Sequence, residues 1–381
     1  MNKKKILSKR QFSLSDPSIT TSEIKEINKM MRNGWNNYNY VEKFEKTFAK
    51  YHNKKYALMT SCCTHAIHLI IKSLNLKKED EIIIPNSTWV SSAFPAAYEN
   101  IKIVFADVDK DDWCLELENL RNYINKRTKA ILFVDLYGNI PNINKIKKII
   151  KNRKIILIED AAEALGSKYN GSKAGTFGDV GVFSFHRTKT ITTGEGGMLI
   201  TNNKKIYLSC KHMRDLGRLK EQPYYSSLIS PKYMPSNISA CIGLTQFKRL
   251  KNLIKKKRLI YNTYKKELAS LNCLNINQDN KNIFNGAWAT TIVLKKNSKI
   301  DSYTMIKSLV KYGIPSRPFF FPLSEMQAFK KYSNKKILKK NNSIYLNKFG
   351  ITLPSSYDLK VNQIKYISKK IKTIIKNSGL N

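Results

Sequence analysis

Short runs of β-branched and aliphatic residues recur along the first half of the chain, and helical stretches separate most of them. Such continuous apolar runs are typical of strands that are buried on both faces of a sheet. They predict a helix at 64–74 and strands at 55–59, 81–84, 102–106, 130–134, 154–158, 180–185 and 197–201. The last two strands are close enough in sequence to pair directly. The pattern therefore predicts an α/β domain with a largely parallel sheet over residues 21–250.

The pattern changes in the C-terminal third. A long helical pattern at 238–271 leads to a strand at 288–294, a helix at 302–312, a proline-rich turn at 317–322 and a last helix at 361–376. These elements predict a smaller α+β domain over residues 251–381, and residues 1–20 form an N-terminal extension. No stretch reaches the roughly 18 uncharged apolar residues that a transmembrane helix needs, so we expect no membrane partner.

Composition adds one question, because the 381 residues carry a formal net charge of +40. A charge of this size can indicate a nucleic-acid-binding regulator. However, the lysines are spread over the whole chain, and the densest runs have the spacing of solvated faces on amphipathic helices. We find no helix-turn-helix signature and no interleaved basic and aromatic strand, so nucleic acid is only a remote alternative. A positive surface would still attract an anionic substrate.

The cysteines and histidines do not suggest a metal centre. Six cysteines are scattered without a CxxC pair, and the five histidines have no metal-ligand spacing. This usage predicts neither a zinc site nor a disulfide framework and fits a reducing cytoplasm. The basic start of the chain has no apolar segment behind it, so we do not interpret it as a secretory signal.

The candidate chemistry begins with Lys189, which lies between a strand and a glycine-rich turn and has hydroxyl residues on both sides. Such a loop suits close approach by a ligand and hydrogen bonding to an anion. Asp160 ends a buried strand, where open α/β sheets present ligand-binding groups. Each signal alone is weak, because most lysines are on the surface and an aspartate often caps a helix. Together they match pyridoxal phosphate, which needs a lysine for the Schiff base and a carboxylate for the pyridine nitrogen.

A phosphate site is predicted where a strand ends and the helix at 64–74 begins. Backbone N–H groups there, the Thr64 hydroxyl and Ser184 could hold a phosphate, although Thr64 could equally be a plain N-cap. Trp89 directly follows another strand end, where its ring could stack on a flat cofactor. A buried core position is an equally good interpretation of Trp89.

These segments resemble the nucleotide-sugar aminotransferase family of DegT/DnrJ type, which consists of pyridoxal phosphate enzymes of fold type I. That fold has a large domain with a mostly parallel sheet and a smaller C-terminal α+β domain. The resemblance covers about residues 20–370 in the order of the family's blocks, at 32–35, 61–69, 85–91, 107–109, 127–130, 136–138, 159–166, 175–180, 184–197, 236–246, 313–323 and 353–355.

The resemblance implies roles for matching residues. Lys189 and Asp160 would be the catalytic pair. Further cofactor contacts are implied for Glu163, Ser184, Thr64, Cys63 and Trp89, and, from the neighbouring subunit of a homodimer, for Asn237 and Lys232. Candidates for substrate contact are His186, Arg317 and Phe319. The chain departs from the family's usual residues at Cys62–Cys63, at Arg187 and at Met234–Pro235.

The implied reaction passes an amino group from glutamate, which leaves as 2-oxoglutarate, to a nucleotide-linked keto-sugar. A dehydratase branch of the family has histidine at the position of the Schiff-base lysine, so Lys189 favours amination. The runs at 158–166 and 189–194 most resemble perosamine synthases, which act at C4 of GDP-4-keto-6-deoxy-mannose. Enzymes for UDP- or TDP-linked keto-sugars share most of these motifs and stay an open alternative.

Overall fold

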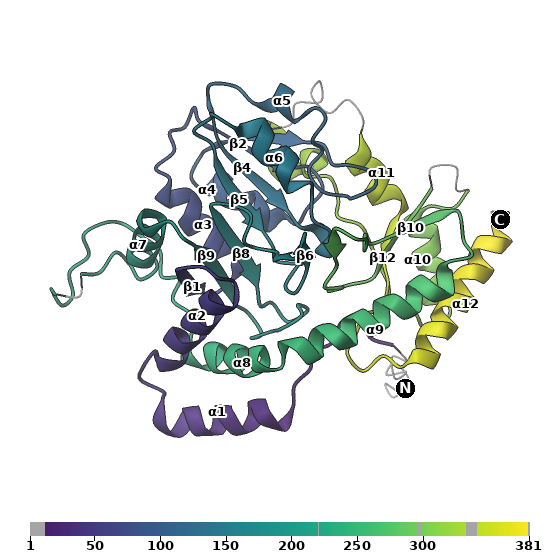
Figure 1. The fold of residues 1–381 in the computed structure, drawn as a ribbon, viewed down its shortest axis with the longest axis horizontal. Helices are drawn as coiled ribbons and strands as arrows, with labels where there is room; N and C mark the ends of the chain where they lie inside the picture. The colour runs from purple at the N-terminus through teal and green to yellow at the C-terminus, as the bar shows by residue number, and fades with distance from the viewer. Residues whose placement is uncertain (1–11, 220, 296–298, 333–340, 380–381) are drawn as a thin grey trace, which may run out of the picture.

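The computed structural model describes residues 12–219, 221–295, 299–332 and 341–379, and its centre is a seven-stranded sheet (Figure 1). The strand order is β1-β9-β8-β5-β4-β2-β3. The strands are β1 (Tyr56–Thr60), β2 (Glu81–Pro85), β3 (Lys102–Ala106), β4 (Thr128–Val134), β5 (Ile156–Asp160), β8 (Val180–Ser184) and β9 (Gly197–Thr201). The five strands from β8 to β3 are parallel, whereas β9 pairs antiparallel with β8 and β1. The predicted strands, the largely parallel sheet and the direct pairing of the last two strands are thus confirmed.

Side chains alternate between two hydrophobic clusters, one on each face of this sheet. Along β4, Ala130, Leu132 and Val134 face one cluster, whereas Ile131 and Phe133 face the other. The first cluster also contains residues of α3 (Cys63–Ser73), α4 (Phe94–Tyr98) and α7 (Lys204–Met213). The second contains residues of α2 (Asn39–Tyr51), α5 (Leu120–Tyr123), α6 (Ile143–Ile150) and α8 (Asn237–Lys248). Helices on both faces explain why the strands read as continuous apolar runs.

The long helix predicted at 238–271 is wrong in one respect, because it is two helices that lie end to end (Figure 1). α8 ends at Lys248 and α9 (Leu250–Leu268) begins after Arg249, whose backbone is not helical (φ −97°, ψ 4°). The Arg249 side chain donates to Glu23 and to the backbone of Ser18. Glu23 lies in α1 (Thr21–Asn33), a helix that packs against α8. A contact between such distant positions leaves no local signal.

The C-terminal part has its own antiparallel sheet, in the order β10-β12-β14-β13. These strands are β10 (Leu274–Ile276), β12 (Thr291–Leu294), β14 (Gly350–Thr352) and β13 (Arg317–Pro318). The strand predicted at 288–294 is β12, which begins three residues later than predicted. The predicted proline-rich turn begins with β13, an edge strand, where proline is tolerated. The helices of this part are α10 (Ser302–Val310), α11 (Asn342–Phe349) and α12 (Val361–Asn377). α12 confirms the helix predicted at 361–376.

Short elements join the two parts. A three-stranded sheet pairs β11 (Ile283–Phe284) with β6 (Lys168–Tyr169), which also pairs with β7 (Ser172–Lys173). One hydrophobic cluster extends without a break from the large sheet into the C-terminal helices. The division at residue 250 therefore stays a prediction. The short 3-10 helices are η1 (Val90–Ser92), η2 (Leu136–Gly138), η3 (Leu323–Glu325) and η4 (Gln327–Tyr332).

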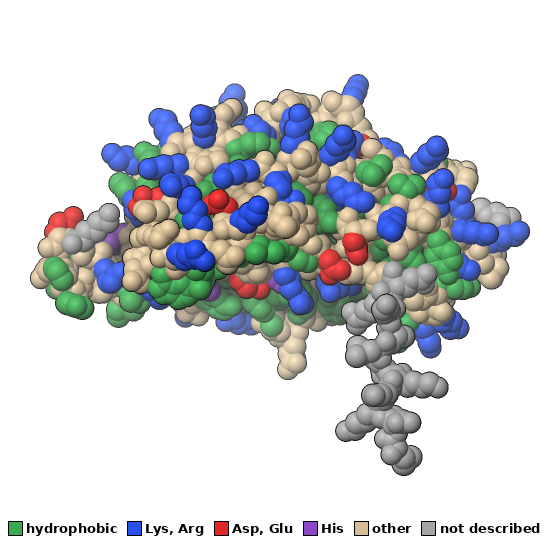
Figure 2. Space-filling view, turned by 90° about the horizontal axis from the view of Figure 1, so that it is seen from below, with side chains coloured by type: hydrophobic (Ala, Val, Ile, Leu, Met, Phe, Trp, Pro, Cys, Tyr) green, Lys and Arg blue, Asp and Glu red, His purple; other side chains and the backbone are tan. Residues whose placement is uncertain are grey.

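The predicted N-terminal extension lies partly outside the described residues, which begin at Phe12. Phe12 is buried, and Leu14 accepts a backbone hydrogen bond from Ser355. None of the described helices is long and apolar enough to cross a membrane. Figure 2 shows lysine and arginine side chains scattered over the whole face in view, as the distribution of charge along the sequence predicts.

Candidate active site

The predicted catalytic residues meet at the edge of the sheet where the parallel strands end. Asp160 is the last residue of β5, and Lys189 follows the end of the neighbouring strand β8. The Lys189 Nζ lies 3.2 Å from the Glu163 Oε1, and both side chains are largely buried. The carboxyl ends of parallel strands are where open α/β sheets bind ligands.

The Asp160 carboxylate is fixed by two donors. The Ser92 hydroxyl donates to its Oδ2 at 2.8 Å, and the Ala162 N–H donates to its Oδ1 at 3.1 Å. Burial raises the pKa of Asp160, whereas these two hydrogen bonds and the charge of Lys189 act to lower it. A buried carboxylate held in this way can stabilise a positive charge next to it. Sequence reasoning missed Ser92, which is 68 positions away from Asp160.

Glu163 connects the amine to a strained turn. Its Oε2 accepts the Tyr137 N–H at 3.0 Å, while its Oε1 faces Lys189. Tyr137 has a left-handed backbone (φ 53°), which is costly for a residue other than glycine. The Glu163 carboxylate therefore fixes the turn at η2 and the lysine together.

The start of α3 is built to accept an anion. Its N-cap is Cys62, whose side chain makes no capping hydrogen bond, so Thr64 lies inside the first turn and is not the N-cap. A Cβ on Gly197 would lie 2.5 Å from the carbonyl carbon of Cys62, so β9 approaches the helix start as only glycine allows. Ser184 pairs with Gly197 across the sheet. Cys63 is buried at this start, and burial raises the pKa of its thiol, which keeps it neutral.

Aromatic rings line the site beside the lysine. Trp89 is 58% exposed, so it is not a core tryptophan, and its ring lies 6.1 Å from that of Phe320. The rings of Phe320 and Trp288 both stack on the ring of Tyr137, with centroid distances of 5.6 and 5.9 Å. Phe319 is only 1% exposed, because it packs against Tyr137 and Trp113. Phe319 thus supports the site from the core, and the prediction that it contacts substrate is not supported.

His186 lies in the lysine loop, and Arg317 is close enough for its charge to act on it. The His186 Nδ1 lies 3.0 Å from the Thr188 hydroxyl, and its Nε2 lies 3.7 Å from the Glu195 carboxylate. Burial lowers the pKa of His186. The Glu195 charge acts to raise it, and the weaker effects of the positive charges of Lys189, Arg187 and Arg317 lower it. Arg187 and Arg317 are the cations of this region that could bind an anion, whereas Lys189 contacts Glu163 and His186 lies near Glu195. Arg317 itself is exposed on β13.

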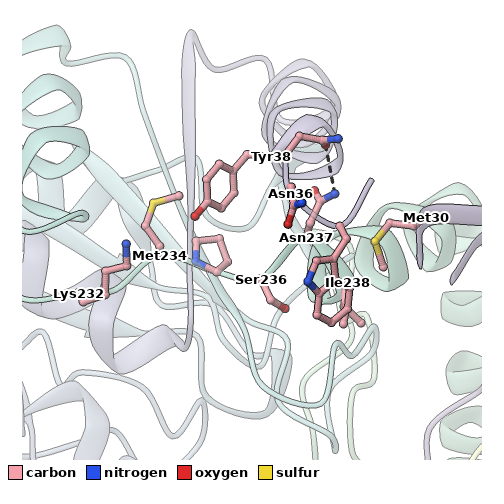
Figure 3. Close-up of a pocket in the computed structure, with 11 residues that line it drawn as sticks. Met30, Asn36, Tyr38, Lys232, Met234, Ser236, Asn237 and Ile238 are labelled. Carbon is pink, nitrogen blue, oxygen red and sulfur yellow. Dashed lines mark hydrogen bonds between the residues drawn. The ribbon is translucent and has the colours of Figure 1, made fainter. Parts of the chain in front are cut away.

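The segment around Asn237 lies at a separate pocket of about 490 Å³ (Figure 3). Ser236, not Asn237, caps α8, because its hydroxyl accepts the Ser239 N–H. The buried Asn237 carboxamide donates to the Gly34 carbonyl at 2.7 Å and accepts the Tyr40 N–H at 3.0 Å. Half-exposed Lys232 forms an ion pair with Asp215. The pocket is lined by Met30, Trp35, Asn36, Asn37, Tyr38, Lys232, Met234, Pro235, Ser236, Asn237 and Ile238.

These groups fit pyridoxal phosphate. Lys189 supplies an amine, the buried Asp160 carboxylate can hold a protonated pyridine nitrogen, and the uncapped start of α3 can hold a phosphate. Within the described residues, no three histidine, cysteine, aspartate or glutamate side chains form a group that could hold a metal ion.

Comparison with known proteins agrees with this geometry. The profile of the DegT/DnrJ/EryC1/StrS aminotransferase family matches residues 17–372. A GDP-perosamine synthase of Escherichia coli O157:H7 is 34% identical over 93% of this chain and 96% of its own. The Escherichia coli GDP-4-keto-6-deoxy-D-mannose-3-dehydratase, solved with bound hydrated PLP, is 27% identical and has a TM-score of 0.87. The match covers 95% of this chain and 99% of the dehydratase chain.

A second solved structure shares the fold. The Helicobacter pylori aminotransferase involved in the biosynthesis of pseudoaminic acid is 22% identical and has a TM-score of 0.90. The match covers 96% of this chain and 99% of that aminotransferase chain. The fold is therefore that of pyridoxal phosphate-dependent sugar aminotransferases, as the sequence predicted. Together with the lysine, carboxylate and phosphate groups described above, these matches show that the chain belongs to the DegT/DnrJ/EryC1/StrS aminotransferase family and is a pyridoxal phosphate-dependent sugar aminotransferase.

Proposed function

We propose that this enzyme transfers an amino group from glutamate to C4 of GDP-4-keto-6-deoxy-mannose, as a GDP-perosamine synthase does. The observation that carries the proposal is Lys189, whose amine lies 3.2 Å from Glu163 at the predicted cofactor position. A dehydratase of this family would have histidine there. The similarity to a named GDP-perosamine synthase over 93% of the chain supports the choice of sugar.

Each residue has a distinct part in this proposal. Bound pyridoxal phosphate supplies an electron sink that makes the α-proton of the amino donor acidic. Lys189 holds the cofactor at rest and, once freed, its amine takes that proton from the donor's Cα as a general base. Asp160 keeps the pyridine nitrogen charged, and Ser92 keeps the Asp160 carboxylate in place. Trp89, being exposed beside Phe320, is positioned to cover a flat ring.

Positive charges near the site would attract the anionic ligands. The cations Arg187 and Arg317 near His186 fit a glutamate carboxylate or a sugar diphosphate, and the net charge of +40 would attract either.

We also propose a homodimer, in which Lys232 and Asn237 serve the partner's cofactor site. The pocket beside these residues, lined by exposed Trp35 and Tyr38, supports an interface there.

The proposed setting is the cytoplasm, in a route to amino sugars of lipopolysaccharide O-antigens. All six cysteines are free thiols, which fits a reducing compartment. A nucleic-acid-binding role has no support from the site, which is built for a small cofactor.

The test is a screen of GDP-, UDP- and TDP-linked 4-keto-6-deoxy sugars with glutamate, read by mass spectrometry of the products. We expect amination of the GDP-linked mannose derivative with release of 2-oxoglutarate. Faster turnover of a UDP- or TDP-linked sugar would contradict the proposed substrate. A product that has lost its 3-hydroxyl group would instead identify a dehydratase.

A further inference from the structure

Trp288 is in contact with both the side chain and the backbone next to the cofactor lysine. The Lys189 Nζ lies 3.8 Å from the centre of the Trp288 ring. The electron-rich face of an indole ring attracts an ammonium group. The indole N–H donates to the Thr188 carbonyl at 2.7 Å. We propose that Trp288 is a positioning residue that holds the Lys189 amine for aminotransfer. The inference depends on the aminotransferase chemistry and not on the identity of the sugar.

The amine is held from two sides. Glu163 contacts the Lys189 Nζ at 3.2 Å, and the Trp288 ring covers it at 3.8 Å. The lysine side chain is only 13% exposed, so water competes little for these contacts. A carboxylate alone would fix a distance, whereas a carboxylate and a ring face together restrict the direction of the amine.

The backbone carbonyls on either side of the lysine are also held by hydrogen bonds. The Thr188 carbonyl accepts from the indole N–H and from the Ser15 hydroxyl, at 2.7 and 3.0 Å. The Thr190 carbonyl accepts from the Tyr357 hydroxyl at 2.6 Å. Trp288 therefore contacts the Lys189 amine with its ring and the Thr188 backbone with its indole N–H.

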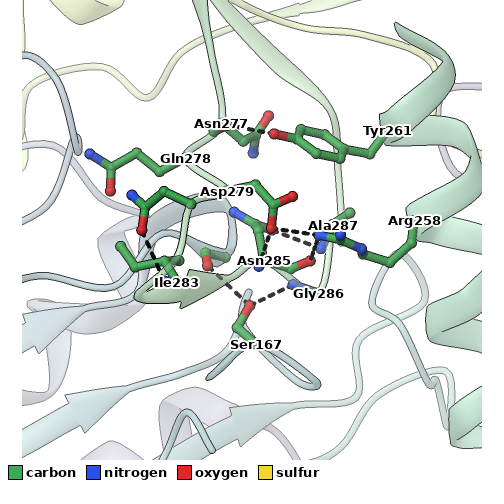
Figure 4. Close-up of polar contacts among 12 residues, drawn as sticks. Ser167, Arg258, Tyr261, Asn277, Gln278, Asp279, Ile283, Asn285, Gly286 and Ala287 are labelled. Carbon is green, nitrogen blue, oxygen red and sulfur yellow. Dashed lines mark hydrogen bonds and ion pairs between the residues drawn. The ribbon is translucent and has the colours of Figure 1, made fainter. Parts of the chain in front are cut away.

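The residues directly before Trp288 in the chain belong to a buried polar network (Figure 4). The neighbouring Ala287 has a left-handed backbone (φ 58°), and its N–H donates to the Asn285 side chain at 2.7 Å. The Asn285 side chain also donates to the Tyr137 carbonyl at 3.3 Å, and Ser167 accepts the Gly286 N–H at 2.8 Å. Such fully bonded buried networks specify one arrangement.

The same network positions both groups that contact the amine. Tyr137, whose carbonyl accepts from Asn277 at 2.9 Å, stacks on the Trp288 ring and donates its own N–H to Glu163. An ordered ring and an ordered carboxylate thus reach Lys189 from one scaffold. Catalysis depends on such placement, because small errors in the position of a reacting group cost much of the rate.

The test measures Lys189 directly in the cofactor-free protein. We compare wild type with Trp288→Leu, which removes the ring, and Trp288→Phe, which keeps a ring face but loses the indole N–H. An amine-reactive reagent is applied at one pH, and the labelling rate of Lys189 is read by peptide mass spectrometry. Tyr312→Leu is the matched control, because the Tyr312 ring lies 4.4 Å from a different lysine, Lys370.

We expect Trp288→Leu to raise the labelling rate of Lys189 roughly three- to tenfold. Trp288→Phe should stay within about twofold of wild type, because phenylalanine still offers a ring face. In the loaded enzyme, kcat of Trp288→Leu should fall at least about tenfold while KM for glutamate stays nearly constant. Tyr312→Leu should leave Lys189 unchanged in every measurement.

Two results would overturn the proposal. One is a folded Trp288→Leu protein whose Lys189 is labelled at the wild-type rate. The other is a Trp288→Phe protein whose Lys189 is labelled as fast as in Trp288→Leu, because a ring face at this position would then not hold the amine. If Trp288→Leu does not fold, Trp288→Met keeps similar bulk without a ring, and the same expectation and the same refutation apply to it.

Discussion

At the scale of single residues, Lys189 should be the lysine that bonds to the cofactor. Borohydride reduction of the loaded protein, followed by peptide mapping, should place the adduct at Lys189. The most informative competitor is Lys257, because burial lowers the pKa of its amine to about 7, so this amine can lose its proton near neutral pH. An adduct on Lys257 or on any other lysine would refute the assignment.

The sequence reveals the residues whose type and local setting are distinctive. Lys189 in a glycine-rich loop and Asp160 at a strand end could both be predicted, and the structure brings them together. Ser92 and Trp288 could not be predicted. Their contacts span 68 and 100 positions, and neither residue carries a local sign of its partner.

Asp160→Asn should leave the protein folded and slow transamination by roughly a hundredfold or more, because the charge that stabilises the pyridine nitrogen is lost. Ser92→Ala removes only one hydrogen bond to that carboxylate and should cost about tenfold. Single-turnover rates with glutamate measure both effects. Near-normal turnover of Asp160→Asn would show that another group controls the nitrogen.

Lys257 should make folding stability depend on pH. It is fully buried, and its Nζ donates to the Ser355 carbonyl at 2.6 Å and lies 4.4 Å from the Tyr357 ring. Below about pH 7 the amine is charged in both states, and the cost of burying that charge is present in full. Between that pH and the ordinary value of 10.5, the folded amine is neutral while the unfolded amine keeps its proton, so stability rises with pH.

Chemical denaturation across this range should therefore favour Lys257→Met over wild type most at low pH. The advantage should shrink as pH rises, by an amount on the order of a few kcal/mol. Lys256→Met is the control, because Lys256 is the half-buried neighbour that donates to the Leu359 carbonyl. If the two variants run parallel across the range, the buried amine does not titrate as described.

At the scale of elements, strands with continuous apolar runs were predictable because burial on both faces dictates their composition. The helix break at Arg249 was not, because it depends on an ion pair with Glu23, 226 positions earlier. The start of α3 was predicted one residue late. The helix begins at Cys63, so the alternative that Thr64 is a plain N-cap is wrong, and β9 packs closely on the Cys62 backbone at this start.

Gly197→Ala should weaken cofactor binding by separating β9 from the start of α3. The added Cβ would lie 2.5 Å from the backbone nitrogen of Cys63, so the helix start must move. We expect the Kd for pyridoxal phosphate to rise about tenfold or more, as measured by titration of the cofactor-free protein. Gly171→Ala is the control, because Gly171 has a left-handed backbone (φ 80°) but open space around it.

The control should lose about 1 kcal/mol of stability from backbone strain and keep its cofactor affinity. A Gly197→Ala protein with unchanged affinity would contradict the phosphate site at α3.

At the scale of the whole molecule, the sequence predicted the fold family and a dispersed positive charge, but the arrangement of subunits depends on a surface. The segment from Lys232 to Asn237 borders a pocket and lies apart from Lys189 in the chain. Asn237 is tied to the loop at 34–40 of its own subunit, so it would act on a partner by holding the shape of this surface. Lys232 is half exposed, and to reach a partner it would have to leave its ion pair with Asp215.

Subunit complementation tests whether active sites are shared in this way. An inactive Lys189→Ala protein is mixed with a protein carrying Lys232→Ala and Asn237→Ala, and the subunits are allowed to exchange. If the segment serves the partner, both lesions fall in one site of each heterodimer and the other site is intact. Random exchange should then restore about a quarter of the wild-type activity, because about half of the dimers are hybrids with one working site.

Two controls make the result decisive. Native mass spectrometry should verify the heterodimer, and thermal melting should show that the doubly substituted protein is folded. A Lys189→Ala protein mixed with Asp160→Asn should restore nothing, because both residues belong to the same chain's cluster and each heterodimer site carries one lesion. If the Lys232 and Asn237 mixture also restores nothing while hybrids are present, these residues act within their own subunit.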